Sequence, residues 1–197
     1  MFTGIIETIG HVKSIIKDES NLHFWIESNI TRELKVDQSV AHNGVCLTVV
    51  EIKDDSYRVT AIDETLQRTN LGTLQAGGKI NIERCMVLNG RLDGHIVQGH
   101  VDCTATVTHI DNANGSWVYR FSHVTQALPL TVEKGSITVN GVSLTVVDAG
   151  DDFFSVAIIP YTYEHTNFHQ FVTGTIVNIE FDVLGKYVAN MLKHLKN

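Results

Sequence analysis

One segment of this sequence occurs twice. Residues 40–83 align without a gap to residues 137–180, and 18 of the 44 aligned pairs are identical. The match includes the turn-forming pair Asn43-Gly44, which returns 97 positions later as Asn140-Gly141. A repeat of this length indicates a duplicated structural unit, and each copy, at roughly 95 residues, is the size of a small domain. We therefore expect two copies of one fold, which can hold two similar small ligands.

The charge balance and the apolar runs exclude two classes of protein. The chain carries 15 Lys and Arg against 22 Asp and Glu, a formal charge of −7, without a basic stripe, so no nucleic-acid partner is expected. The apolar runs fall far short of the roughly 20 residues that a membrane helix needs, so no membrane partner is expected either. The first residues lack the basic and apolar regions of a signal peptide, and three cysteines do not make a disulfide framework. These features predict a cytoplasmic protein.

Short segments rich in Val, Ile and Thr, bounded by Gly, Asn and Asp, dominate the sequence. This chemistry favours β-strands, and many short strands with few helical patterns are typical of a small barrel or sandwich. We therefore predict an all-β fold with domains at 1–95 and 96–183 and a linker near 89–93. Short helical turns are expected at 31–34 and 125–128. The expected strand segments are 39–52, 57–62, 79–83, 101–110, 116–122, 136–148, 154–159 and 175–181.

One clear helical pattern lies outside the repeat, at residues 184–195. A helix of about 12 residues is marginal alone, so its apolar face must dock on another surface. Because the pattern occurs in a single copy, we expect residues 184–197 to form an oligomerisation helix that packs against other subunits. Apolar residues at helical spacing define that face: Leu184, Tyr187, Val188, Met191, Leu192 and Leu195.

Several separate motifs resemble those of a known family. They are the opening Met1–Glu7, the doubled Asn-Gly-Val-Cys/Ser-Leu-Thr-Val, the segment Gly94–His100 and the doubled Thr-x-x-x-Thr-Asn. Together they make the chain similar to riboflavin synthases of the alpha-chain type, from residue 1 to about residue 192. The resemblance implies two tandem homologous six-stranded antiparallel Greek-key barrels, plus a C-terminal α-helix that assembles a homotrimer.

The activity that the resemblance implies is that of a transferase. In the family, two molecules of 6,7-dimethyl-8-ribityllumazine occupy one active site and pass a four-carbon unit between them, giving riboflavin and 5-amino-6-ribitylaminouracil. The resemblance implies no cofactor and no metal, and it implies an association with lumazine synthase. Duplicated sites suit this reaction, because two ligands held in register turn a bimolecular step into an effectively unimolecular one.

The two substrates have different fates, so the positions at which the copies differ are informative. Cys46 aligns with Ser143, Ile5 with His100, and Cys85 with Asp182. Removing a proton from the C7 methyl group of the lumazine requires a base and donors that hold the anion, and the richer polar set lies in the second copy. The predicted catalytic residues are His100, Ser143, Thr145, Asp182 and Cys46.

Each of these residues has an ordinary structural alternative. His100 suits proton transfer near neutral pH, but it could also bond a backbone carbonyl. Cys46 could be a buried thiol, the usual state of a free cysteine, and Asp182 could be a helix N-cap. His95 is equally compatible with a ligand contact and with a loop. A metal site that joins His95 and His100 to Cys103 is disfavoured, because residues 100 and 103 of a strand point to opposite faces.

The resemblance implies a larger set of substrate-binding positions. In the first part of the chain they are Gly4, Ile5, Ile6, Ser39, Cys46, Leu47, Thr48, Thr60, Ala61, Ile62, Asp63, Glu64 and Thr65. In the second part they are His95, Gly99, His100, Val101, Lys134, Ser143, Leu144, Thr145, Ala157, Ile158, Ile159, Pro160, Tyr161 and Thr162. Lys134 is equally compatible with a solvated loop. Tyr161 and Tyr163 flank Thr162 where the first copy has Glu64 and Leu66, which leaves the ribityl contacts of the second copy open.

Two other functions stay open at this point. A lumazine protein, a non-catalytic relative with the same fold, would hold a lumazine or a flavin as a chromophore. The intact motifs Gly99–Val101 and Gly141–Thr145 favour the enzyme. A structural β-repeat protein would bind no chromophore at all.

Overall fold

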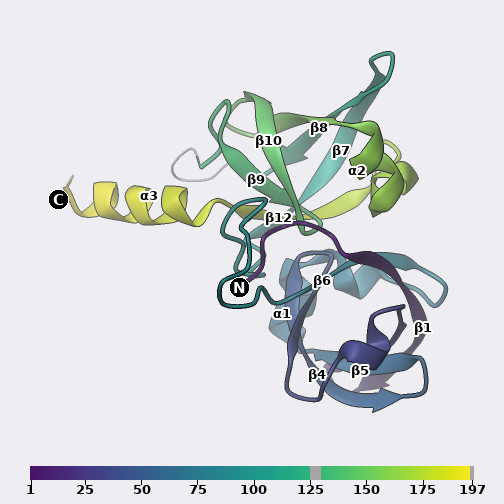
Figure 1. Ribbon diagram of the computed structural model, residues 1–197. Helices are drawn as coiled ribbons and strands as arrows, with labels where there is room; N and C mark the ends of the chain where they lie inside the picture. The colour runs from purple at the N-terminus through teal and green to yellow at the C-terminus, as the bar shows by residue number, and fades with distance from the viewer. Residues whose placement is uncertain (125–129, 196–197) are drawn as a thin grey trace.

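The computed structural model describes residues 1–124 and 130–195, except for the side chains of 193–195. These residues form two closed antiparallel barrels of six strands each, followed by helix α3 (Val183–Leu195) (Figure 1). The prediction of two six-stranded barrels and a C-terminal helix is confirmed. The turn expected at 125–128 lies outside the described residues. Within the described residues, we find no helix with the length and apolar character that crossing a membrane requires.

The first barrel closes in the strand order β1-β2-β5-β4-β3-β6. Strands β2 to β5 form a Greek key, because β2 lies beside β5 while β3, β4 and β5 follow one another as hairpins. The strands are β1 (Thr8–Asp18), β2 (Asn21–Glu27), β3 (Ser39–His42), β4 (Val45–Lys53), β5 (Ser56–Ala61) and β6 (Lys79–Arg84). Short helices η1 (Thr31–Glu33), α1 (Asp63–Arg68) and η2 (Asn70–Thr73) join them.

The second barrel repeats this order, with β7 to β12 in place of β1 to β6. Irregular register falls at matching places, next to Val12 and Val49 in the first barrel and next to Val107 and Val146 in the second, where β-bulges bend the strands. The strands are β7 (Cys103–Asn112), β8 (Trp117–His123), β9 (Ser136–Val139), β10 (Val142–Ala149), β11 (Phe153–Ile158) and β12 (Ile176–Phe181). Helices α2 (Pro160–His165) and η3 (Asn167–Gln170) correspond to α1 and η2.

Alternating side chains of each strand fill the barrels. Val49 and Val59 are fully buried in the first barrel, and their counterparts Val146 and Val156 are fully buried in the second. Burying one such side chain stabilises the fold by about 1.5–3 kcal/mol. A shift of one residue would turn this apolar set outward, so the core fixes the register and thereby the side chains that face outward from each barrel.

Buried asparagines join the two barrels by reciprocal hydrogen bonds. Nδ2 of Asn81 donates to the carbonyl of Asn140 at 2.9 Å, and Nδ2 of Asn178 donates to the carbonyl of Asn43, also at 2.9 Å. Asn43 and Asn140 have φ of +47° and +44° and precede glycines with positive φ, as in the tight turns that suit β-hairpins. The Asn-Gly bends expected from the sequence are thus the hairpin turns β3–β4 and β9–β10, and both lie at the barrel interface.

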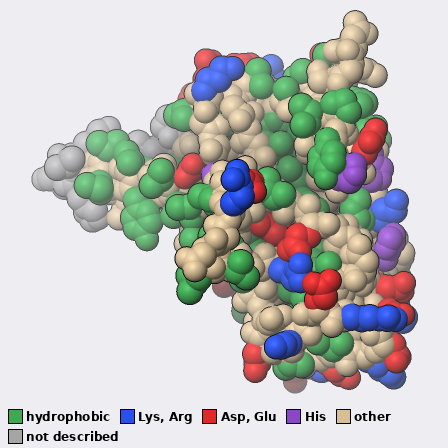
Figure 2. All heavy atoms as spheres, in the orientation of Figure 1, with side chains coloured by type: hydrophobic (Ala, Val, Ile, Leu, Met, Phe, Trp, Pro, Cys, Tyr) green, Lys and Arg blue, Asp and Glu red, His purple; other side chains and the backbone are tan. Residues whose placement is uncertain are grey.

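Helix α3 extends away from the second barrel (Figure 1). Its apolar side chains are exposed, with Leu184 and Tyr187 each 67% and Met191 65% accessible, and they form an apolar surface on this part of the molecule (Figure 2). Apolar residues at helical spacing are expected to pack against a partner surface. Within one chain, the described residues leave this face of α3 open to solvent.

A buried histidine distinguishes the core of the first barrel from that of the second. Nε2 of His42 lies 2.9 Å from the hydroxyl of Tyr57, and both side chains are fully buried. The second barrel has Val139 and Phe154 at these positions. Burial lowers the pKa of His42 to about 4, because the charged imidazolium cannot be solvated in the core.

This histidine predicts an acid-labile first barrel. In the unfolded chain His42 binds a proton near its ordinary pKa of about 6.5, whereas in the folded chain it does so only near pH 4. The unfolded state therefore binds more protons between these values, and the free energy of unfolding should fall by up to roughly 3 kcal/mol as the pH drops through this window. Urea unfolding at a series of pH values, followed by the fluorescence of Trp25 in a Trp117→Phe background, measures the slope.

The second barrel supplies the control for this experiment. A double variant, His42→Val with Tyr57→Phe, copies the second barrel's residues and should remove this part of the pH dependence. An unchanged slope in the double variant would show that another group causes it.

Candidate functional site

The segment that leads into each barrel crosses to the other barrel. We call residues 1–7 and 96–102 the lead-in segments. The N–H of Ser143, on β10 of the second barrel, donates to the carbonyl of Gly4 at 2.7 Å. The N–H of Cys46, on β4 of the first barrel, donates to the carbonyl of Gly99 at 2.9 Å. Each strand that follows an Asn-Gly turn therefore has a lead-in segment bonded beside it. Along the chain, that segment leads into the other barrel.

The contact between each lead-in segment and its strand leaves room only for glycine. Gly4 and Gly99 have φ of +76° and +80°, in the left-handed region that glycine adopts without strain. A Cβ atom on Gly4 would lie 2.6 Å from the Cβ of Ser143, and one on Gly99 would lie 2.6 Å from the Cβ of Cys46. The residues that follow continue the crossing, since Ile6 packs on the core of the second barrel and Val101 on that of the first.

The first site is a cavity of about 260 Å³ beside Cys46. Three elements build it: β4, helix α1 with the residue that follows it, and the lead-in segment that carries His100. The lining therefore combines a thiol, hydroxyls, a Glu64–Arg68 ion pair of 3.1 Å and an exposed imidazole. The lining residues are Val45, Cys46, Glu64, Thr65, Arg68, Thr69, Gly99, His100 and Val101.

The thiol of Cys46 is not activated as a nucleophile. Burial raises its pKa, and a hydrogen bond with the side chain of Ser39 opposes that rise only in part. A thiol needs a lowered pKa to react as the thiolate at neutral pH. Cys46 can therefore serve as a small contact surface and a weak hydrogen-bond donor toward a ligand.

The second site is organised by a hydrogen-bonded serine and histidine. Nδ1 of His95 lies 2.6 Å from Oγ of Ser143, and its Nε2 lies 3.1 Å from Oγ1 of Thr138. Burial lowers the pKa of His95, and the negative charge of Asp182 opposes that effect in part. A neutral imidazole held between two hydroxyls can accept a proton from one of them. The arrangement matches a base next to a hydroxyl that it can activate.

Asp182 caps helix α3, and its charge acts on a nearby imidazole. Its Oδ1 accepts from the N–H of Leu184 at 3.0 Å, which caps the first turn of α3 as an N-cap residue does. Its charge also acts on His95. Asp182 thus lies at the N-terminal end of α3 and acts electrostatically on the histidine of the serine–histidine pair.

The helices beside the two sites carry different side chains at matching positions. In α1, Glu64 and Arg68 form an ion pair, whereas in α2 the rings of Tyr161 and His165 stack at 4.0 Å. The first site thus has a charged wall, and the equivalent wall of the second copy is aromatic. This is the difference between the two copies that the sequence showed around Thr162.

Comparison with known proteins gives a consistent result. A family model of the lumazine binding domain matches residues 3–85 and again residues 98–182. The riboflavin synthase of Actinobacillus pleuropneumoniae is 41% identical over 193 residues, which cover 98% of this chain and 90% of that protein. The riboflavin synthase of Bacillus amyloliquefaciens is 40% identical over the same shares. A crystal structure of LumP complexed with riboflavin matches with a TM-score of 0.85 at 26% identity, over 92% of this chain and 99% of that one.

The chain belongs to the riboflavin synthase family. The two matched stretches contain the two barrels, with one lumazine binding domain in each. The recognition made from the sequence motifs is therefore confirmed, as is the tandem arrangement.

The grouping of residues expected from the sequence was wrong in one respect. His100 was placed with Ser143 and Asp182 in the second site, but it lines the first site beside Cys46. The imidazole bonded to Ser143 is that of His95. The reason is the crossing of the lead-in segments, since aligning the two copies assigns each segment to its own barrel. For the same reason Gly4 lies on Ser143 rather than beside Cys46.

Some predicted binding residues cannot present their side chains to a ligand. Leu47 and Ala61 are buried in the core of the first barrel, and Ile158 is buried in that of the second. Only their backbone groups could face a ligand. Lys134 is exposed with φ of +64°, and its N–H donates to the carbonyl of Val146 at 2.9 Å, so its local role is that of a turn residue. The predicted positions that do face outward include Thr48, Ile62, Thr145, Ala157 and Ile159.

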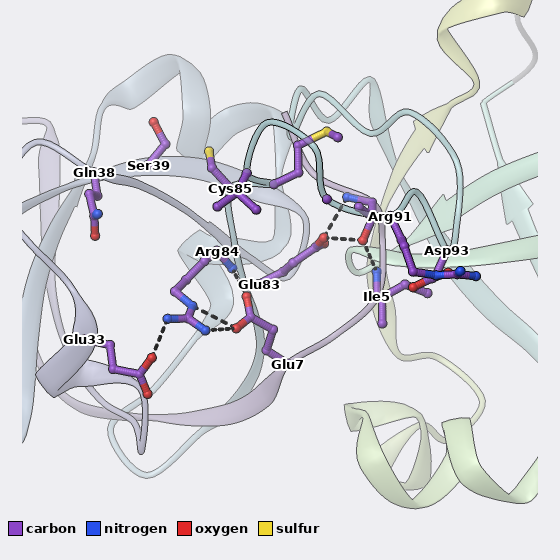
Figure 3. Close-up of a pocket in the computed structure, with 14 residues that line it drawn as sticks. Ile5, Glu7, Glu33, Gln38, Ser39, Glu83, Arg84, Cys85, Arg91 and Asp93 are labelled. Atoms are coloured by element: carbon purple, nitrogen blue, oxygen red, sulfur yellow. Dashed lines mark hydrogen bonds and ion pairs between the residues drawn. The ribbon is translucent and has the colours of Figure 1, made fainter.

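A larger cavity of about 520 Å³ lies between β6 and the segment that joins the barrels (Figure 3). Its charged groups pair with one another, since Arg84 contacts Glu7 at 2.6 Å and Glu33 at 2.8 Å. Their pairing leaves no free cation or anion centre among these three residues. Ser39 and Cys85 line the same cavity, so it adjoins the outer face on which Cys46 lies.

The sequence did not assign roles to four residues that the structure connects to these sites. Arg68 and Thr69 line the first site. Glu83 and Glu180 hold the lead-in segments by hydrogen bonds. The available signal was the repetition of Asn-Ile-Glu at 81–83 and 178–180, since a glutamate in a buried strand needs partners.

The close contact at Gly99 predicts a selective loss of stability. Gly99→Ala adds left-handed strain of about 1–2 kcal/mol and a clash with Cys46 and with the ring of Phe2. Gly77→Ala is the matched control, because Gly77 has φ of +86° with no atom within 4 Å of an added Cβ. In urea unfolding, Gly99→Ala should therefore lower the free energy of unfolding clearly more than Gly77→Ala. Equal losses would mean that the lead-in segment is not pressed against β4.

Proposed function

We propose that this chain catalyses the riboflavin synthase reaction. Two molecules of 6,7-dimethyl-8-ribityllumazine would give riboflavin and 5-amino-6-ribitylaminouracil by transfer of a four-carbon unit. The family membership supports the reaction, and the doubled site supports a mechanism that needs two similar ligands. Holding both ligands in register supplies much of the rate gain, because it removes the entropic cost of their encounter.

The single observation that carries the mechanism is the contact between His95 and Ser143. At 2.6 Å, with the pKa of His95 lowered by burial, the pair offers a neutral base and a hydroxyl in the second site. Proton removal from the C7 methyl group needs such a base and a donor that holds the resulting anion. Thr145 lies outward on the same strand as Ser143, and Asp182 acts on His95.

The first site would hold the second lumazine in a different environment. There His100 supplies an exposed imidazole, and Cys46 supplies a protonated thiol in place of the hydroxyl of Ser143. Because the two environments differ, bound donor and acceptor need not be equivalent. We therefore assign catalytic roles to His95, His100, Ser143, Thr145 and Asp182, and a ligand contact to Cys46.

The proposal includes the assembly that the family resemblance implies. Helix α3 presents an exposed apolar face, which supports a contact between subunits at α3. The homotrimer is carried over from the family resemblance, and the cytoplasmic location stays the proposal made from the sequence. We place each active site between neighbouring subunits, with the first site of one chain facing the second site of the next. Association with lumazine synthase is carried over from the same resemblance.

Turnover and binding, measured separately, test the assigned roles. His95→Ala, His100→Ala and Asp182→Ala should each lower the rate of riboflavin formation at saturating lumazine by about 10²–10⁴-fold, the usual loss when a general acid or base is removed. Lumazine binding, followed by its fluorescence, should weaken much less. Cys46→Ser should be milder, because it keeps a small polar group and copies the second site.

Two outcomes would contradict this proposal. If all three alanine variants keep turnover within about threefold of the parent while Cys46→Ser abolishes it, the chemistry depends on the thiol of the first site. If the parent protein binds lumazine but forms no riboflavin, the chain is a binding protein of the same fold.

Removal of residues 184–197 tests the assembly. Without α3 the chain loses the apolar face that we assign to the subunit contact, so sedimentation should show monomers, and activity should fall strongly because each active site needs two chains. The full-length chain is the control. A trimer that survives the deletion would show that other surfaces hold the subunits together.

A further inference from the structure

A buried carboxylate of the second barrel holds the lead-in segment that carries His100. Glu180, on β12, is 3% exposed. Its Oε1 accepts from the N–H of Gln98 at 2.8 Å, and its Oε2 accepts from the N–H groups of Gly99 and His100 at 2.9 and 3.0 Å. Hydrogen bonds to an ionised carboxylate are roughly twice as strong as neutral ones. Three successive residues of the lead-in segment are therefore fixed by one side chain.

The first barrel contains the matching arrangement. Glu83, on β6, is 4% exposed. Its Oε1 accepts from the N–H and the hydroxyl of Thr3 at 2.7 and 2.8 Å, and its Oε2 accepts from the N–H of Gly4 at 3.0 Å. Figure 3 shows Glu83 reaching from its strand toward the other lead-in segment. The two carboxylates thus occupy equivalent positions of the two copies, and each accepts hydrogen bonds from the backbone of a lead-in segment.

Each lead-in segment is also fastened to its own barrel at a second point. Oδ2 of Asp102 accepts from the N–H of Phe181 at 2.9 Å, and Oε1 of Glu7 accepts from the N–H of Arg84 at 2.7 Å. Together with the bonds to Glu180 or Glu83, these bonds hold each lead-in segment at two points. The position of His100 in the first site is therefore set by groups on β12 of the second barrel.

Because the lead-in segments cross, each glutamate holds a segment that lies at the site of the other barrel. Glu180 belongs to the second barrel, but the segment it holds completes the cavity beside Cys46. Glu83 belongs to the first barrel, but the segment it holds lies on Ser143. The charge of Glu180 reaches Cys46, since it adds to the rise in the pKa of that thiol, which burial mainly causes.

We propose that Glu180 is a positioning residue for the first site and Glu83 a positioning residue for the second, so that each barrel sets the geometry of the other barrel's ligand site. The inference rests on the proposed lumazine and flavin binding at these sites. A purely structural role would lower stability and weaken both sites alike, whereas the crossed role acts on one site at a time.

Replacing either glutamate with glutamine tests the crossed role with little change in shape. Glutamine keeps one acceptor oxygen but turns an NH₂ group toward backbone donors, so at least one N–H of the lead-in segment loses its partner. The full-length chain is titrated with ¹³C-labelled riboflavin, and the bound signals are observed by NMR. Thr65→Val and Thr162→Val, each altering one site, identify which signal belongs to which site.

The expected result is reciprocal. Glu180→Gln should weaken riboflavin binding at the first site by about tenfold or more, the effect of one lost buried hydrogen bond to a charged group, and leave the second site within about twofold. Glu83→Gln should do the opposite. Equal weakening at both sites, or weakening at the site of the glutamate's own barrel, would overturn the proposal.

The backbone amide signals of Gly99 and Gly4 separate this inference from the proposed function. Glu180→Gln should shift the signal of Gly99 and not that of Gly4, and Glu83→Gln should shift that of Gly4 and not that of Gly99, whether or not riboflavin binds. If the parent chain binds no riboflavin, the proposed function fails while these signals still report the positioning. If a glutamine variant does not fold, the aspartate variant replaces it, because its shorter side chain keeps the charge but moves the carboxylate away from the lead-in segment. It should show the same selectivity between sites. A uniform effect on both sites would again contradict the crossed role.

Discussion

Hydrogen bonds between buried asparagines hold the two barrels in one relative position, and the candidate sites depend on that position. The amide of Asn81 reaches the carbonyl of Asn140 in the other barrel, and the amide of Asn178 reaches that of Asn43. The backbones approach so closely that a Cβ atom on Gly44 would lie 2.7 Å from the nitrogen of Gly141. Leaving one such buried partner unsatisfied costs about 1–3 kcal/mol, which favours a single docking of the barrels over nearby alternatives.

This docking makes the crossing of the lead-in segments feasible. Phe2 and Val97 pair across the interface, with N–H to carbonyl distances of 2.7 and 3.1 Å in the two directions, and from there each segment runs onto the opposite barrel. Each candidate site therefore needs residues from both halves of the chain. A fragment of residues 1–93 would contain Cys46 and Thr65 but would lack His100 from its own chain, so the two copies are less independent than a tandem repeat suggests.

The sequence predicted the fold well, but it did not predict which lead-in segment completes the site on which barrel. Both outcomes have physical reasons. Repetition and strand chemistry led to two barrels, because alternation of buried and exposed residues is a local property. Strands β1 and β2 were not among the expected segments, since exposed positions of β1 carry residues such as Lys13 and Lys17 that do not favour strands. The crossing is not local: which barrel receives Gly99 depends on how the barrels dock.

The candidate site residues divide along the same line. Ser143, Cys46 and Thr65 were proposed because the repeat marks them, and His95 was left undecided because its partner Ser143 is 48 residues away along the chain. Leu47 and Ile158 were included although they face the barrel cores, since a match to a motif does not separate the two faces of a strand. What distinguishes the sites is therefore visible only when both barrels and both lead-in segments are placed together.

The central claim is that each ligand site combines a strand of one barrel with the lead-in segment of the other. A crystal structure of the full-length protein with a non-reactive lumazine analogue tests it most directly. The account predicts one ring against Cys46, Thr65 and His100, and another against Ser143, with Gly4 and Ile5 beside it. Rings that contact His100 together with Ser143, or that bind away from both glycine contacts, would contradict it.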